Sequence, residues 1–135
     1  MPLEIKEFNL KKIGIRAVLG DLESELMEII WTRNKELTNR ELLEILNRKR
    51  KKILEVSTIN ITMARLFKKG LVTRRLEAIR GGYHYLYRAS MTKEAFISKI
   101  SKKILTHLRN CFGDKPFKAG FATVSLLSAE SESES

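Results

Sequence analysis

Few residues of this chain have side chains that commonly perform catalysis or bind metals. The only histidines are His84 and His107, and the only cysteine is Cys111. Neither histidine belongs to a pattern of paired cysteines or carboxylates. One thiol can form neither an internal disulfide nor a thiolate metal cage, so Cys111 is interpreted as a small buried apolar residue, with a redox-sensing thiol or an intersubunit disulfide as the alternatives. The sequence therefore predicts no enzyme, no metal site and no cofactor.

The chemistry that remains is that of positive charge. The formal net charge of the 135 residues is +10. Residues 33–88 hold 15 Lys and Arg against 5 Asp and Glu, so this segment carries the whole excess, and the remainder is neutral. A basic segment between neutral ones suits a polyanionic partner such as double-stranded DNA. From charge alone, a solvated basic face that maintains solubility explains the segment equally well.

A predicted helix from Ser57, its expected N-cap, to about Lys69 concentrates this charge on one side. Ile59, Met63, Leu66 and Phe67 fall within about 100° of arc and form the expected core face. The opposite face has small polar groups, two cations and no carboxylate; its members are Ser57, Thr58, Ile61, Ala64, Arg65 and Lys68. Such a face suits the major groove of DNA. Ile61 is either an ordinary surface residue or a contact for a thymine methyl group.

Other predicted elements position this helix. Leu22 opens a first helix capped by Asp21, and Thr38 with Glu41 forms the capping box of a second. The strand-like runs 71–76 and 83–87 flank an Arg80–Gly82 turn, which predicts a β-hairpin. Arg80 is either a DNA contact at the hairpin tip or a plain turn cation. The tyrosines at 83, 85 and 87 share one strand face and are expected to pack on the helices, with a base-stacking platform as the alternative.

The C-terminal part is predicted to form a dimer. Thr92 caps a long helix to about Cys111, and Gly113-Asp114 ends it. We expect its apolar stripe to pack against the same helix of a second copy of the chain. The alternative is that this helix folds back on its own domain. The expected dimer-interface residues are Phe96, Ile97, Ile100, Ile104, Leu105 and Leu108.

These elements define a mainly α fold, a winged helix-turn-helix followed by a helical dimerisation segment. The predicted divisions are an N-terminal extension 1–18, a winged-helix domain 19–90, a helical dimerisation region 91–127 and a disordered acidic tail 128–135. No apolar run approaches the roughly 20 residues of a membrane span, and the first residues lack a signal-peptide core. A cytoplasmic location without membrane contact is therefore expected.

Four ordered segments carry a resemblance to a known family. They are the run Leu19–Trp31, the run Leu37–Leu43, residues 58–63 with 65–72, and the hairpin strand 82–87 followed by 91–96. Over residues 19–114 the chain resembles the BlaI/MecI/CopY repressors, which include the penicillinase repressors. The resemblance implies a homodimer that binds a palindromic operator and dimerises through its C-terminal helices. It also implies base contacts from the start of the third helix, here Ser57, Thr58, Asn60, Ile61 and Thr62.

The chain also departs from that family. Members often have Lys at the position of Ser57 and Thr at that of Ile61, so a different operator is expected. The copper-sensing branch has a C-terminal cysteine cluster, whereas this chain has only Cys111. The penicillinase branch is cleaved at an Asn-Phe bond, and no Asn-Phe pair exists here. The sequence names no inducing ligand or protease.

The resulting prediction is a sequence-specific transcriptional repressor. Two alternatives stay open: a winged-helix protein–protein interaction module and a non-specific architectural DNA-binding protein. A protein-binding module favours a neutral or apolar third-helix face, and an architectural protein binds every duplex equally.

Overall fold

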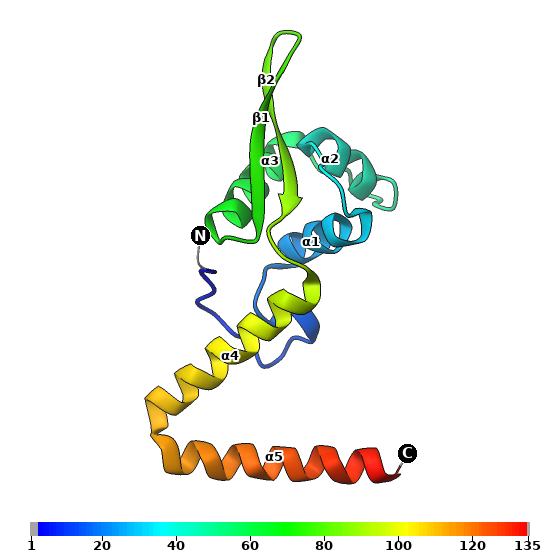
Figure 1. Cartoon of the computed structure of the whole chain (residues 1–135). Coiled ribbons are helices and arrows are strands. Elements are labelled where there is room, and N and C mark those ends of the chain that lie inside the picture. The colour runs from blue at the N-terminus through cyan, green and yellow to red at the C-terminus, as the bar shows by residue number, and fades with distance from the viewer. Residues whose placement is uncertain (1–2, 135) are drawn as a thin grey trace. The chain divides into compact units, whose positions relative to one another are not determined.

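The structure is a computed structural model that describes the backbone of residues 3–134 and the side chains of residues 3–128. It divides into two compact units, Met1–Phe96 and Ile97–Ser135. The first unit has the predicted order of three helices followed by a hairpin (Figure 1). The fold is a winged helix-turn-helix with a C-terminal helical segment, as the sequence predicts.

Three helices form the core of the first unit: α1 (Asp21–Arg33), α2 (Asn39–Asn47) and α3 (Val56–Lys68). Each buries part of the apolar stripe expected from its periodicity, whereas Leu22, Ile29, Leu43 and Ile45 are half-buried. The fully buried side chains come from all three helices and include Leu26, Met27, Ile30, Leu42, Ile59, Met63 and Leu66. The core face predicted for the third helix is therefore confirmed, except that Phe67 is only half-buried.

The helix ends confirm part of the predicted capping. Thr38 Oγ1 accepts a hydrogen bond from Glu41 N at 3.1 Å, and Thr38 N donates to the Glu41 carboxylate at 3.2 Å, which completes the capping box. The cap predicted at Asp21 is wrong, because Gly20 is the N-cap and the Glu23 carboxylate accepts from its backbone N–H at 3.0 Å. The cap predicted at Ser57 is also wrong, because α3 begins at Val56 after Glu55. Gly70 follows α3 with φ +84°.

Strands β1 (Val72–Ile79) and β2 (Gly82–Ala89) form the predicted antiparallel hairpin, with Val72 opposite Ala89 and Ile79 opposite Gly82. Arg80 and Gly81 make its turn, where Gly81 takes φ +89°, a conformation that glycine adopts without strain. Leu37 adds a short bridge through reciprocal backbone hydrogen bonds with Tyr87, of 2.9 and 2.8 Å. This bridge ties the base of the hairpin to the chain before α2, and the sequence did not reveal it.

The N-terminal segment, residues 3–20, is part of the first unit. It contains the 3-10 helix η1 (Gly14–Ala17) and buries Ile5, Ile15, Ala17 and Leu19. Glu4 N donates to the carbonyl oxygen of Lys69 at 3.0 Å, which joins this segment to the end of α3. Its burial gives it a defined place against the helices.

Helix α4 (Lys93–Phe112) begins in the first unit, and Thr92 Oγ1 accepts from Ala95 N at 3.1 Å, as the predicted cap requires. The interface role predicted for Phe96 is corrected. Phe96 is only 1% exposed, and its ring lies 5.6 Å from that of Trp31, whose Nε1 donates to Met91 O at 3.0 Å. It is a core residue because it closes the hydrophobic cluster beside α1.

The second unit contains the rest of α4 and helix α5 (Asp114–Glu134), separated by Gly113 at φ +86°. The predicted helix break is therefore confirmed. Apolar side chains remain exposed along both helices: Ile97, Leu108, Phe112, Phe121, Val124, Leu126 and Leu127. Ile104 and Leu105 are half-buried, whereas Ile100 is 7% exposed and offers little surface to a partner. The predicted disordered tail, 128–135, lies almost wholly outside the residues whose side chains are described.

Candidate nucleic-acid interface

Helix α3 brings together most of the residues predicted to touch DNA. Ser57, Asn60, Ile61, Arg65 and Lys68 are exposed, and Thr58 is half-buried. Ile61 is 56% exposed, so an apolar side chain lies open to solvent among these polar and basic residues. Because the N-cap of α3 is Glu55, two residues before the predicted cap, Ser57 lies in the first turn of α3 with its hydroxyl free of any capping role.

Thr62 does not belong to this exposed surface. It is 6% exposed, and its hydroxyl donates to the carbonyl oxygen of Thr58, one turn earlier, at 2.8 Å. Its position beside the core stripe explains this burial, since the hydroxyl must then find a backbone acceptor. The base contact predicted for Thr62 is corrected accordingly.

Asn60 is anchored by the preceding helix. Asn39 at the start of α2 donates through Nδ2 to Asn60 Oδ1 at 2.7 Å. This bond occupies the Asn60 oxygen and leaves its amide nitrogen as a donor toward solvent. The contact fixes the α2–α3 arrangement on the exposed side, where a recognition surface must be pre-organised.

The cations of the first unit fall into two groups. Several are neutralised by carboxylates: Arg50 by Glu25 at 2.7 Å, Lys69 by Glu23 at 2.8 Å, and Arg75 by Glu36 at 2.7 Å. Within the described part of the chain, no ion pair engages the cations on the exposed side of α3 and the hairpin, namely Arg65, Lys68, Arg74 and Arg80. Among the described residues, no carboxylate neutralises these four cations, so their charge remains available to a polyanion.

Arg74 is a residue that the sequence analysis missed. Its guanidinium carbon lies 3.9 Å from the Phe67 ring centroid and 4.1 Å from that of Tyr85. Stacking uses the faces of the guanidinium group, so the N–H donors around its edge remain available. Such a group is a pre-organised phosphate ligand. Only the residue type could have suggested it from sequence, because the two rings meet Arg74 through the tertiary fold.

The hairpin contributes unevenly. Arg80 lies in the turn at its far end, away from α3 (Figure 1). Exposure of the three tyrosines rises toward this turn, from 2% at Tyr87 through 38% at Tyr85 to 69% at Tyr83. The predicted packing on the helices therefore holds for Tyr87, whereas Tyr85 stacks on Arg74 and Tyr83 is open to solvent.

Among the described residues, no group of three or more His, Cys, Asp or Glu side chains could hold a metal ion. His107 and Cys111 lie one turn apart on α4 with Nε2 and Sγ 3.3 Å apart. Cys111 is exposed, so its interpretation as a buried apolar residue is wrong. No helix in the described part of the chain is long and apolar enough to span a membrane.

The fold and its exposed basic helix define a winged-helix DNA-binding protein. A comparison with protein families gives a match to the penicillinase repressor family over residues 19–131. The chain therefore belongs to the penicillinase repressors, the BlaI/MecI/CopY family, as its sequence pattern indicated. This is a family of DNA-binding transcriptional regulators and not a class of enzymes. A comparison with curated proteins gave no match.

Proposed function

We propose that the protein is a sequence-specific repressor that binds a palindromic operator as a homodimer. The observation that carries this proposal is the exposed surface of α3, which has no carboxylate and whose Arg65 and Lys68 form no ion pair with any residue that the structure describes. A protein-binding module has no need of such a surface. On this proposal the protein acts in the cytoplasm, where it meets its operator.

Base recognition is assigned to the first half of α3. Ser57, Thr58 and the Asn60 amide can donate to base edges in the major groove. Ile61 can contact a thymine methyl group, which is the apolar feature of that groove. These short side chains allow the helix backbone to approach the base edges closely. Arg65 and Lys68, one to two turns later, have longer side chains that can reach phosphates from farther away.

Phosphate binding is assigned to the cations around this helix. Arg65 and Lys68 follow the base-reading residues, Arg74 is held between two rings beside α3, and Arg80 lies at the hairpin tip. Each neutralised phosphate releases counterions, so the logarithm of affinity should fall by about 0.9 per contact for each unit of log salt concentration.

Dimerisation is assigned to the second unit. Apolar side chains lie exposed on both α4 and α5, among them Leu108, Phe112 and Phe121, and exposed apolar surface of this kind is a candidate for burial against a partner. A second copy related by a two-fold axis is the simplest cover for it. Two-fold symmetry also matches two α3 helices to two half-sites one helical turn, or a multiple, apart.

Selection and competition test the proposal. Genomic fragments retained by the protein should share an inverted repeat, and bulk DNA should compete poorly for them. Affinity for the repeat should fall steeply with salt, and sedimentation should give a dimer at micromolar concentration. Equal competition by any duplex would establish the architectural alternative, and failure to bind any duplex would favour a protein-binding module.

A further inference from the structure

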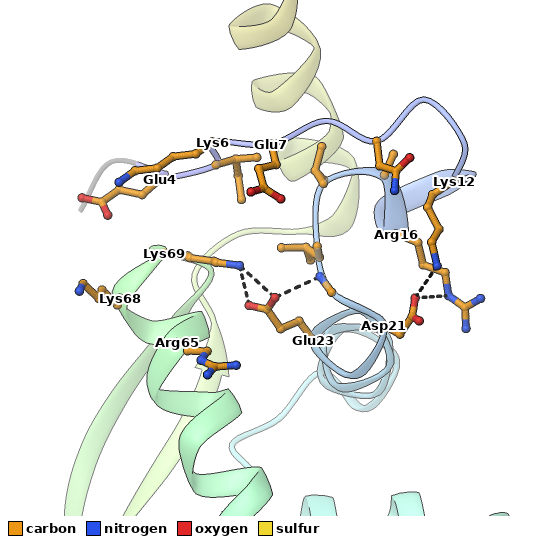
Figure 2. Close-up of a pocket in the computed structure, with 16 residues that line it drawn as sticks. Glu4, Lys6, Glu7, Lys12, Arg16, Asp21, Glu23, Arg65, Lys68 and Lys69 are labelled. Atoms are coloured by element: carbon orange, nitrogen blue, oxygen red, sulfur yellow. Dashed lines mark hydrogen bonds and ion pairs between the residues drawn. The ribbon is translucent and has the colours of Figure 1, made fainter.

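The N-terminal segment forms one wall of a cavity of about 620 Å³. The start of α1 and the last turns of α3 form the rest (Figure 2). Cavities of this size hold small-molecule ligands. The proposed DNA-binding role does not account for this cavity, and residues 4–18 of its lining precede the segment that matches the repressor family.

Buried contacts hold the wall in place. Ile5, Ala17 and Leu19 line the cavity and are each less than a tenth exposed. The Glu4–Lys69 backbone bond joins the segment to α3. Lys69 Nζ in turn donates to both oxygens of the Glu23 carboxylate, at 2.9 and 2.8 Å, as the dashed lines in Figure 2 show. The cavity is therefore lined by packed elements and not by a free chain end.

The charges of the lining favour an anion. Six cations face four carboxylates, a surplus of two positive charges. The two carboxylates of α1 are already engaged, Asp21 by Lys12 and Arg16 and Glu23 by Lys69. Among the described residues, Lys6, Arg65 and Lys68 have no ion-pair partner and outnumber the two unpaired carboxylates, Glu4 and Glu7.

We propose that this cavity binds a small organic anion bearing carboxylate or phosphate groups, and that its binding opposes DNA binding. The anionic groups meet Lys6, Arg65 and Lys68, and the carbon skeleton lies against Ile5 and Leu19. Arg65 and Lys68 also belong to the proposed DNA surface, so this second part rests on the proposed function. An anion that neutralises them withdraws the charge that DNA phosphates require.

A hollow favours a small ligand over DNA as the occupant. Arg65 and Lys68 are exposed, so a duplex can reach them from outside, whereas only a small molecule fits into the space that they line together with Lys6. If the N-terminal cations were additional phosphate contacts, they would act from the protein surface. In that case Lys6 would contribute to DNA affinity in the absence of any small anion.

Calorimetry on the full chain tests the site itself, without DNA. Citrate and inorganic pyrophosphate serve as separate probes for carboxylate and phosphate, each at fixed ionic strength. We expect at least one of them to bind saturably at one site per chain, with a dissociation constant below about 1 mM. Lys6→Ala should weaken that binding threefold or more. The matched control, Lys11→Ala, removes an exposed cation of the same segment that does not line the cavity, and it should leave binding unchanged.

DNA titrations test the coupling. Without a probe, both variants should bind DNA as the wild type does. The better-binding probe should then lower DNA affinity in the wild type and in Lys11→Ala, and clearly less in Lys6→Ala. Absence of saturable binding by either probe, or equal binding by the two variants, would overturn the anion site. Weaker DNA binding by Lys6→Ala without a probe would identify Lys6 as a DNA contact and overturn the proposal. If the wild type bound the anion but no DNA, the proposed function and the coupling would be contradicted, and the anion site would stand.

Discussion

The neighbouring residues Arg74 and Arg75 allow a sharp test of which cations bind DNA. Both are arginines of β1, but their surroundings differ. Arg74 is stacked on Phe67 and Tyr85, and it forms no ion pair within the described part of the chain. Arg75 is bound to Glu36 at 2.7 Å and lies 3.6 Å from the Glu77 carboxylate. Replacing each by Ala removes the same side chain from the same strand, so any difference reflects these surroundings.

The expected magnitudes follow from the contacts. A charge-assisted hydrogen bond to phosphate contributes about 1.5–3 kcal/mol, so Arg74→Ala should weaken DNA binding about tenfold or more. The slope of log affinity against log salt should also decrease in magnitude by about 0.9. Arg75→Ala should change affinity less than twofold and leave the slope unchanged, because its charge is already compensated.

Arg74→Lys separates charge from stacking. Lysine keeps the positive charge but lacks the planar group that lies between the two rings. We expect the salt slope to be retained and the affinity to fall a few-fold. Fluorescence anisotropy at several salt concentrations measures all three variants, and thermal unfolding checks that they fold. If Arg74→Ala and Arg75→Ala weakened DNA binding equally, the idea that only cations without ion pairs bind phosphates would be refuted.

Three further predictions concern other parts of the molecule. Arg65→Ala should weaken DNA binding about tenfold with little change in melting temperature, because Arg65 is exposed; an early melting transition would contradict its placement on α3. Leu108→Asp should shift the sedimentation coefficient from dimer to monomer, because Leu108 lies on the exposed stripe of α4, whereas Leu10→Asp at an 88% exposed site should not. Phe96→Ala should lower the free energy of unfolding by about 3–5 kcal/mol in a denaturant titration, and a loss below about 1 kcal/mol would remove Phe96 from the core.

The features that could be predicted from sequence are those set by neighbours along the chain. Helical periodicity located the core face of α3, and the Thr38–Glu41 spacing identified the capping box of α2. Gly113 marked the end of α4 because its backbone takes a conformation that glycine favours. In each case the determining contact joins residues at most four positions apart, or follows from a repeated pattern within one helix.

The features that were missed depend on contacts between distant segments. The interface role given to Phe96 was wrong because its partner, Trp31, lies far away in the sequence. The role of Arg74 became visible only in the fold, where α3 and β2 bring the rings of Phe67 and Tyr85 within 3.9 and 4.1 Å of its guanidinium carbon. The N-terminal segment shows no periodicity, and the backbone bond from Glu4 to Lys69 depends on no particular side chain, so no sequence signal marked its place.

If the cavity binds an anion as proposed, the end of α3 offers a physical route by which a small molecule could regulate DNA binding. Arg65 and Lys68 line the cavity and also lie on the proposed DNA surface, so an anion and DNA compete for the same charges. When binding is mutually exclusive, an anion present at about 100 times its dissociation constant lowers the apparent DNA affinity about 100-fold, or about 2.7 kcal/mol. A 100-fold loss of affinity is enough to release the operator when the repressor concentration is less than about 100 times the dissociation constant for the operator. Because competition requires no conformational change, variants of Lys6 should alter the anion concentration needed for release without altering DNA affinity itself.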